Sequence, residues 1–437
     1  MYLPIILSSM LFNFIIGNVL NHDEKHHRFS KKSILTFGVV SNIALLVYFK
    51  YTDFMIDNCN RLLDTNIPTL DLALPLAISF FTFQQISYLV DSYRQETREY
   101  DLLNYALFVT FFPQLIAGPI VHHKEMMPQF SKTRNKVKNY KNIAMGLFIF
   151  SMGLFKKVVI ADTFSVWATQ GFDVATTLNL FEAWATSLSY TFQLYFDFSG
   201  YTDMAIGIAL LFNIKLPINF NSPYKATDIQ DFWRRWHITL SRFLKEYIYI
   251  PLGGNRKGEF RTYTNLLATF ILGGIWHGAG WTFVFWGFLH GIALVMHRAW
   301  SKFGVKLWRW LAWLITFNFI NIAWVFFRAK EWGDAIKVLA NMFSLDDIVL
   351  PTFLASRLHF LPTHGVSFGP LASHLSAGMD VIIWLVIGFI IILLFPNTSN
   401  KLQIFKPNIV HMFIFSIAFT ISFYKLSGYS EFLYFRF

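Results

Sequence analysis

Residues 262–297 contain no Asp, Glu, Lys or Arg, and this long uncharged stretch limits what the chain can form. As one continuous helix it would be roughly 54 Å long at about 1.5 Å per residue, whereas the hydrocarbon core of a bilayer is about 30 Å thick. The stretch must therefore break or fold back. Glycine weakens a helix and permits close backbone approach, so the glycines at positions 273, 274, 278 and 280 predict where it breaks.

His277 lies at this predicted break, between Trp276 and Trp281. An ionisable side chain is costly to keep in lipid, so the first hypothesis is that His277 faces a protein cavity and takes part in chemistry. The alternative is a histidine that joins helices by bonding to a neighbouring carbonyl, as polar residues in membrane helices commonly do. The stretch alone does not decide between these two hypotheses.

The composition places the chain among polytopic membrane proteins. It is 54% apolar, 19% aromatic and only 14% charged, with a mean hydropathy of +0.43, which is not the composition of a soluble domain. The single cysteine, Cys59, excludes an internal disulfide and a zinc-thiolate site. The net charge of +11 does not indicate nucleic acid, because the basic residues cluster in loops between apolar segments, as cytoplasmic loops do.

We predict a single all-α integral membrane domain over residues 1–437, with about nine to eleven membrane helices, re-entrant segments included. The apolar segments are residues 2–20, 34–51, 72–90, 102–121, 143–160, 262–297, 310–327, 379–395 and 409–425, and one further segment begins at about residue 181. The first lacks a basic start and a cleavage site, so we expect a retained helix rather than a signal peptide.

The distribution of Lys and Arg predicts the topology of these segments. The basic loop after the first segment is expected inside, which places Met1 outside. Residues 161–180 contain no Lys or Arg and are expected outside, whereas residues 213–262 form the largest cytoplasmic interfacial region. We expect a long loop between the segments at 310–327 and 379–395.

The segment at 102–121 is predicted to be re-entrant. Simple alternation would place the basic loop that follows it outside, against the usual distribution of positive charge. The conflict disappears if the segment enters the membrane and returns on the same side. Pro113, Gly118 and Pro119 supply the break that such a turn requires.

A second group of polar and aromatic residues occupies positions 231–258. A helix from about Asp228 places Trp233, His237 and Leu240 on one face. One interpretation is an interfacial helix with no catalytic role. The other is a donor entrance, at which the neighbouring Arg234 and Arg235 bind the phosphates of a cytoplasmic acyl donor while His237 faces the tunnel.

Several further polar residues are weaker candidates. His290 follows His277 by thirteen positions, and a packing role is favoured for it. Asp197, Ser199 and Asp203 are suited either to orient a histidine or to cap a buried helix end.

The adjacent histidines at 122 and 123 are followed by Glu125. Adjacent helical residues point in different directions, so we expect a solvated loop rather than metal ligands.

A histidine in a cavity that excludes water is suited to acyl transfer onto a hydroxyl. It can accept the proton of the alcohol as the oxygen attacks, while the membrane protects a thioester donor from hydrolysis. No serine lies in a G-x-S-x-G motif, so a serine acyl-enzyme is not favoured.

Motifs distributed over essentially the whole chain together resemble the membrane-bound O-acyltransferase family, most closely its bacterial alginate O-acetylase branch. They are, in order, L-P-L-A-I-S-F-F, F-F-P-Q-L-I-A-G-P-I, Q-L-Y-F-D-F-S-G-Y-T-D-M-A-I-G, W-R-R-W-H-I-T-L-S, Y-I-P-L-G-G-N-R-K-G, G-G-I-W-H-G-A, W-G-F-L-H-G, F-P-N-T and the terminal F-L-Y-F-R-F. Relatives in this family usually begin with about two more hydrophobic segments, which leaves the outer rim and the position of Met1 open.

The resemblance implies a helical fold around a central funnel or tunnel, in which His277 matches the catalytic histidine and His237 the second, cytoplasmic-side histidine. It implies transfer of an acetyl group from a cytoplasmic donor, expected to be acetyl-CoA with no bound cofactor or metal, across the inner membrane. A periplasmic or membrane-anchored acetyltransferase partner would then modify alginate, peptidoglycan, cellulose or another glycan. The residues expected to bind substrate are Trp233, Arg234, Arg235, Trp276, Asp197, Asp203 and His290.

Two other functions remain open from the sequence. One is transfer of D-alanine from a carrier protein to teichoic acid, which the W-R-R-W-H and N-R-K-G motifs fit less well. The other is a transporter that makes no bonds. Transporters commonly carry internal repeats, and the W-H-G region has no second copy in the chain.

Overall fold

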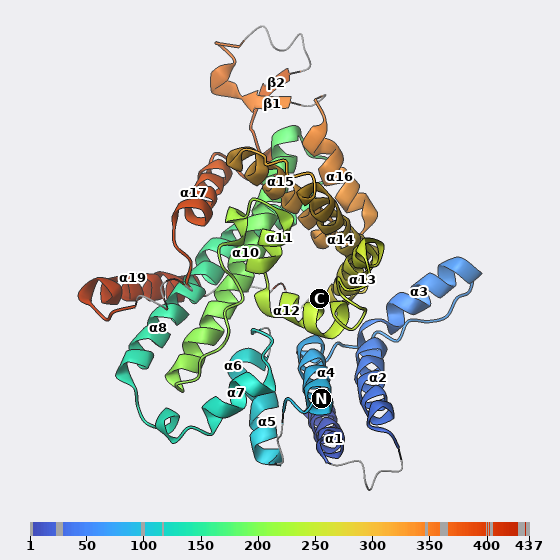
Figure 1. Ribbon diagram of the computed structural model, residues 1–437. Helices are drawn as coiled ribbons and strands as arrows, with labels where there is room; N and C mark the ends of the chain where they lie inside the picture. Colours follow the sequence, from blue (N-terminus) through green and yellow to red (C-terminus); the bar gives the residue numbers. More distant parts are fainter. Residues whose placement is uncertain are drawn as a thin grey trace.

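The computed structural model describes residues 3–22, 29–97, 101–115, 118–345, 348–358, 366–398, 400, 402, 405–426 and 433. Residues 23–28 of the expected basic loop at 21–32 lie outside this described part, as does most of the terminal F-L-Y-F-R-F motif. Helices form nearly all of the described structure (Figure 1).

The helices and strands follow one another along the chain as α1 Leu3–Asn21, α2 Lys31–Lys50, α3 Thr52–Leu63, α4 Ile78–Tyr93, α5 Leu102–Thr110, α6 Phe112–Leu115, α7 His123–Phe130, α8 Tyr140–Phe155, α9 Asp162–Thr169, α10 Leu180–Leu211, α11 Ile229–Arg235, α12 Ile238–Leu244, α13 Glu259–His277, α14 Trp281–Ser301, α15 Arg309–Arg328, α16 Trp332–Phe343, β1 Ile348–Pro351, β2 Val366–Gly369, α17 Asp380–Leu394 and α19 Ile409–Lys425. Three π-helical turns are named η3 Lys156–Ala161, η4 Gln170–Val174 and η6 Lys245–Tyr249.

Several of these helices are suited by length and composition to cross a membrane. In the described residues they are α1, α2, α15 and the continuous helix Tyr140–Val174, and α17 and α19 are shorter apolar helices. The predicted spans at 310–327, 379–395 and 409–425 agree closely with α15, α17 and α19. The protein is therefore an all-α polytopic membrane protein, and the number of membrane segments stays a prediction.

One segment expected to be a loop contains regular structure. The expected loop after α15 holds α16 and the parallel pair β1–β2. Residues 161–180, expected outside, are mostly helical, since α8 continues through η3, α9 and η4 as far as Val174, and their place outside stays a prediction. Charge and hydropathy did not detect α16, because this helix is only partly apolar. α16 buries only Ala335, Val338 and Met342.

The segment at 102–121 breaks, as predicted. α5 ends at Thr110, Phe111 has an extended backbone, and α6 begins at Phe112. Pro113 lies in the first turn of α6, where its missing N–H group leaves no helical hydrogen bond unmade. The return of this segment to the same side of the membrane stays a prediction.

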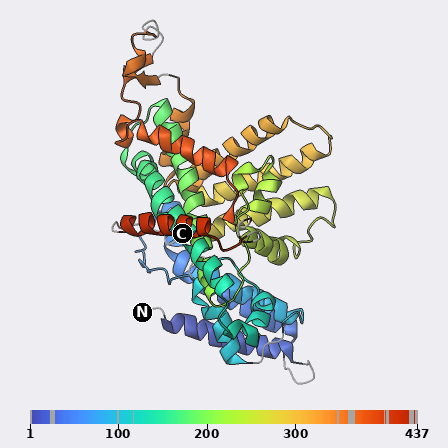
Figure 2. The same ribbon diagram turned by 90° about the vertical axis from the view of Figure 1, so that its left-hand side faces the viewer.

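Helix α10 lies in the middle of the molecule in both views (Figures 1 and 2). It begins with a capping box between Asn179 and Glu182, which satisfies the free amide groups of the first turn. It packs against α8, α9, α15, α16 and α17. The contact with α8 is very close, because a Cβ added at Gly153 would lie 2.5 Å from the carbonyl oxygen of Gly200.

The uncharged stretch folds back as a helical hairpin, which confirms the predicted break. α13 ends at His277, Gly278 is extended, and Gly280 caps the start of α14. The glycines at 273 and 274 do not take part in the break and remain inside α13. Gly274 instead permits close packing, since a Cβ there would lie 2.3 Å from the carbonyl oxygen of Phe283 in α14.

Replacing Gly274 with Val is expected to destabilise the hairpin by at least about 1–3 kcal/mol, the usual cost of overpacking. The neighbour that blocks the added atoms is backbone and cannot rotate away. The unfolding temperature of the purified protein in detergent measures the effect. Gly333→Ala in α16 is the matched control, because no atom lies within 4 Å of the added Cβ. Equal unfolding temperatures for the two variants would show that close packing of α13 and α14 is not required.

Candidate active site

His277 lies in a box of aromatic rings where three helices meet. It is the last residue of α13 and is 4% exposed. Its ring centroid lies 4.9 Å from that of Trp276, 5.1 Å from that of Trp286 in α14 and 5.0 Å from that of Phe327 in α15. An imidazole held among such rings is shielded from bulk water, which suits proton transfer to or from a reacting group.

Trp286 connects His277 with two more of the predicted site residues. Its ring lies 4.8 Å from that of His290 and 5.9 Å from that of Trp233. The indole Nε1 of Trp233 donates a hydrogen bond to Nδ1 of His290 at 3.2 Å. Because Nδ1 is the acceptor, neutral His290 carries its proton on Nε2. The predicted residues 233, 277 and 290 therefore belong to one aromatic cluster.

His237 lies near Trp276 and is fully buried. The ring centroid of Trp276 is 6.5 Å from that of His237 and 4.9 Å from that of His277. Nδ1 of His237 donates to Oδ1 of Asn219 at 3.1 Å. The backbone N–H of Thr239 also donates to this atom, which identifies the atom as the oxygen, and not the nitrogen, of the Asn219 side-chain amide. The Nε2 atom of neutral His237 therefore carries the lone pair.

The expected continuous helix through residues 228–240 is wrong. Asp228 does cap the helix start, by accepting from the amide of Asp231, but α11 ends at Arg235. His237 has φ 42° and ψ 54°, in the left-handed region, and α12 begins after it. The bond to Asn219 helps hold this unusual backbone, so His237 does not share a helix face with Trp233.

A cavity of about 510 Å³ lies beside this cluster, at the end of the molecule where α13 begins and α14 ends. Trp233 and Phe270 line it on the side of the histidines. Its cationic lining residues are Arg234, Lys245 and Arg298. Trp233 lines the cavity, its ring contacts that of Trp286, and the ring of Trp286 contacts that of His277. The cationic and aromatic lining makes the cavity a candidate site for an anionic ligand with an apolar reactive end.

The two neighbouring arginines have different surroundings. Arg234 lines the cavity, as the donor-entrance hypothesis expects. Arg235 is not among the lining residues, and its Nε atom lies 2.9 Å from both carboxylate oxygens of Asp231. A guanidinium in this ion pair stabilises α11 and is not directed at the cavity.

Asp197 and Asp203 pair with lysines, which replaces the hypothesis that they orient a histidine or cap a helix end. Both lie inside α10. Asp197 is 2.7 Å from Nζ of Lys157, and Asp203 is 2.6 Å from Nζ of Lys156. Charges inside a membrane protein usually occur as such pairs. The pairs account for two lysines in an otherwise apolar segment.

The expectation of a solvated loop for His122 and His123 is wrong. Their exposed fractions are 1% and 4%. Nδ1 of His122 lies 3.1 Å from the hydroxyl of Tyr247 and 3.6 Å from Asp91, and the ring of His123 packs against Phe108. The sequence predicts that two adjacent polar residues at a helix start are exposed to solvent. In the structure, residues of α4 and η6 pack against these two histidines and bury them.

Three residues near the histidines were missed by the sequence reasoning. Asn219 holds His237, Trp286 connects His277 with His290, and Lys50 contacts the backbone of His277. The aromatic motif W-G-F-L-H-G gave some indication of Trp286. Nothing in the sequence pairs Lys50 with a residue 227 positions away.

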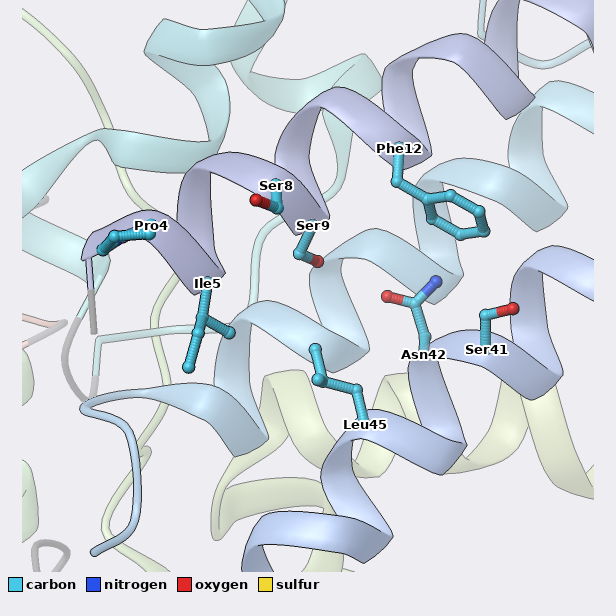
Figure 3. Close-up of a pocket in the computed structure, with 8 residues that line it drawn as sticks. All are labelled: Pro4, Ile5, Ser8, Ser9, Phe12, Ser41, Asn42 and Leu45. Atoms are coloured by element: carbon cyan, nitrogen blue, oxygen red, sulfur yellow. The ribbon is translucent and has the colours of Figure 1, made fainter. Parts of the chain in front are cut away.

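A second hollow, of about 390 Å³, lies between α1 and α2 (Figure 3). Its labelled residues come from these two helices alone, including Ser9 and Asn42. Asn42 and Asn13 exchange side-chain hydrogen bonds of 2.7 and 3.1 Å beside it. Such amide pairs join membrane helices, and no histidine lines this hollow.

The buried histidines, the aromatic rings around His277 and the adjacent cationic cavity are features expected of a membrane-embedded enzyme. The sequence profile of the membrane-bound O-acyltransferase family matches residues 29–330, which include His237, His277 and His290. The chain belongs to this family and is an O-acyltransferase.

Three relatives show what the chain is similar to. The peptidoglycan O-acetyltransferase of Helicobacter pylori is 57% identical over 378 residues, covering 80% of this chain and 71% of that protein. The "probable alginate O-acetylase" of Azotobacter vinelandii is 40% identical over 363 residues, covering 82% and 72%. The teichoic acid D-alanyltransferase of Streptococcus thermophilus is 28% identical over 239 residues, covering 52% and 57%.

Proposed function

We propose that this protein transfers an acetyl group from cytoplasmic acetyl-CoA across the inner membrane for O-acetylation of peptidoglycan, with His277 as the general base. The identity of 57% with a peptidoglycan O-acetyltransferase is the observation that carries the choice of acceptor. The alginate O-acetylase relative is less similar, at 40%. A periplasmic or membrane-anchored acetyltransferase partner receives the acetyl group and completes the transfer to the glycan.

The cationic cavity is the proposed donor site. It lies at the end of the hairpin that carries Glu259 and Arg298, and the chain after Arg298 continues with basic residues at 302, 306 and 309. Basic residues at the ends of membrane segments favour the cytoplasmic side, where acetyl-CoA is made available. Arg234 and Lys245 are suited to bind the phosphates of the donor, which directs its acetyl thioester towards Trp233.

The proposed chemistry uses His277 to move one proton. The imidazole takes the proton of the acceptor hydroxyl as that oxygen attacks the thioester carbonyl. The C–S bond then breaks, and the imidazolium returns the proton to the thiolate of CoA. His237 has its Nδ1–H bound to Asn219, so its Nε2 atom carries a lone pair, and we propose that this atom accepts a hydrogen bond from the donor or the acceptor during transfer. The ring of Trp276 contacts that of His277 and lies 6.5 Å from that of His237.

Transfer of D-alanine from a carrier protein is the alternative with less support. The D-alanyltransferase relatives are 28% and 27% identical and match 52% and 59% of this chain. A carrier protein would place a long phosphopantetheine arm in the same cavity, so the geometry of the site alone does not distinguish the two donors.

The test of the proposal uses purified protein in detergent with radiolabelled acetyl-CoA and peptidoglycan fragments, with and without membrane extract as a source of the partner. We expect thioester loss and base-labile label on the glycan. Transfer from D-alanyl carrier protein without transfer from acetyl-CoA would contradict the proposal. Label on alginate but not on peptidoglycan would contradict the proposed acceptor alone.

Replacing Arg234 with Ala is expected to raise the KM for acetyl-CoA by about 10- to 100-fold, since a hydrogen bond to a charged group contributes about 1.5–3 kcal/mol. The kcat should change much less, because Arg234 does not touch the reacting atoms. Arg261→Ala is the control: this arginine is exposed and does not line the cavity. An unchanged KM for the Arg234 variant would exclude the cavity as the donor site.

A further inference from the structure

The last turn of α13 is capped by two residues from the end of α2. The final carbonyl groups of a helix have no amide partner within it. The hydroxyl of Tyr51 donates to the carbonyl oxygen of Ile275 at 2.5 Å. Nζ of Lys50 donates to the carbonyl oxygens of Trp276 at 2.6 Å and of His277 at 3.1 Å. Two adjacent residues thus satisfy three consecutive carbonyl groups at the helix end that carries His277.

The position of Lys50 is not explained by its place in α2. A lysine at the end of an apolar segment usually extends to the membrane surface, where its ammonium group is hydrated. Here Nζ turns inward, lies 3.4 Å from Oγ of Ser79 and is 5.9 Å from the ring centroid of Trp276. The cation also faces the negative end of the α13 dipole, which favours it at this place.

We propose that Lys50, assisted by Tyr51, is a positioning residue that sets the place of the His277 imidazole for acyl transfer. This inference rests on the proposed role of His277. The carbonyl group of His277 that Lys50 binds and the Cβ atom that carries the imidazole are attached to the same Cα atom, so a shift of the carbonyl group displaces the base of this side chain. The chain that follows, Gly278–Ala279–Gly280, has no large side chain to restrain it. A displacement of about 1 Å at a reacting group can lower the rate about a hundredfold.

The alternative is a cap that only stabilises the fold. Both interpretations predict some loss of stability when the ammonium group is removed. They differ in kinetics, because a structural cap lowers activity only in proportion to the folded protein, whereas a positioning residue lowers kcat of the protein that is folded. The conservative variant also distinguishes them: arginine keeps the donors and the charge but reaches the carbonyl groups with a different geometry.

The experiment measures kcat and KM for acetyl-CoA in Lys50→Met, Lys50→Arg and Tyr51→Phe, each normalised to folded protein. We expect kcat to fall about 10- to 100-fold in Lys50→Met with KM within about twofold, as misplacement of a catalytic group predicts. Lys50→Arg should recover part of this loss, and Tyr51→Phe should lower kcat about threefold. Lys32→Met is the matched control, an exposed lysine at the other end of α2.

Each outcome separates this inference from the proposed function. If His277→Ala is inactive and Lys50→Met has the kcat of wild type, only the role of Lys50 is overturned. If His277→Ala keeps its activity, the proposed base is wrong whatever Lys50 does. If the apparent kcat of Lys50→Met falls only because less of the protein is folded, and equals the wild-type kcat after normalisation to folded protein, the positioning role is overturned. If Lys50→Met does not fold, the kcat values of Tyr51→Phe and Lys50→Arg decide, and wild-type values for both would overturn it.

Discussion

Replacing His277 with Gln is expected to lower kcat for acetyl transfer by about 10²–10⁴-fold, the range in which general acid–base catalysis contributes. Gln is polar and of similar reach, so it should remain in the box formed by Trp276, Trp286 and Phe327. It cannot take the proton of the attacking hydroxyl. The KM for acetyl-CoA should stay within about threefold, because His277 is not among the residues that line the donor cavity.

The measurement is release of CoA thiol by the purified variant, with its unfolding temperature determined in the same preparation. His411→Gln is the matched control, since this histidine lies in α19 and bonds to the carbonyl oxygen of Lys406. We expect wild-type activity from it. Activity of His277→Gln within tenfold of wild type would exclude His277 as the base and return it to the alternative of a packing histidine.

The hairpin that carries His277 was predictable because its determinants are local. A stretch too long for one span needs a break, and glycine is the residue that permits one. The sequence also predicted Trp233 and His290 as site residues. The structure places both in one aromatic cluster with His277. It did not distinguish glycines that break the hairpin from Gly274, which packs it, because that difference depends on which residue of α14 lies opposite.

The break at His237 was not predictable from periodicity. Residues 228–240 have the pattern of one helix, but a tertiary bond to Asn219, 18 positions earlier, competes with it. Tertiary contacts of this kind override local helix preference. For the same reason no pattern separated Arg234 from Arg235, although only one of them lines the cavity.

The buried ion pairs of α10 could have been predicted in part from the sequence. Lys156 and Lys157 stand in an apolar segment, and Asp197 and Asp203 stand in the next one. Charges in membrane segments are rarely left unpaired, so equal numbers of opposite sign in neighbouring helices predict that they meet. Assigning each partner requires the register of the two helices, which only the structure supplies.

Removing one member of the Lys156–Asp203 pair is expected to cause the largest loss of stability. The two side chains are 16% and 9% exposed and their charged atoms are 2.6 Å apart. Thr398 bonds to both, since its Oγ1 atom accepts from Lys156 at 2.9 Å and donates to Asp203 at 2.6 Å. Lys156→Met leaves a buried carboxylate without its counter-ion, which should cost about 3–5 kcal/mol. Asp203→Leu should cost a similar amount.

A double-mutant cycle on this pair, followed by unfolding in detergent, tests the physical reason for that loss. Lys156→Met combined with Asp203→Leu removes both charges, so it should recover most of the stability that either single change loses. The exposed pair Lys124–Glu96 has the similar separation of 2.7 Å at exposed fractions of 48% and 41%, and Lys124→Met should therefore cost less than about 1 kcal/mol. If the two losses add in the double variant, the cost lies in lost packing and not in an uncompensated charge. The F-P-N-T segment that holds Thr398 would then be held against η3 and α10 by packing rather than by the ion pair.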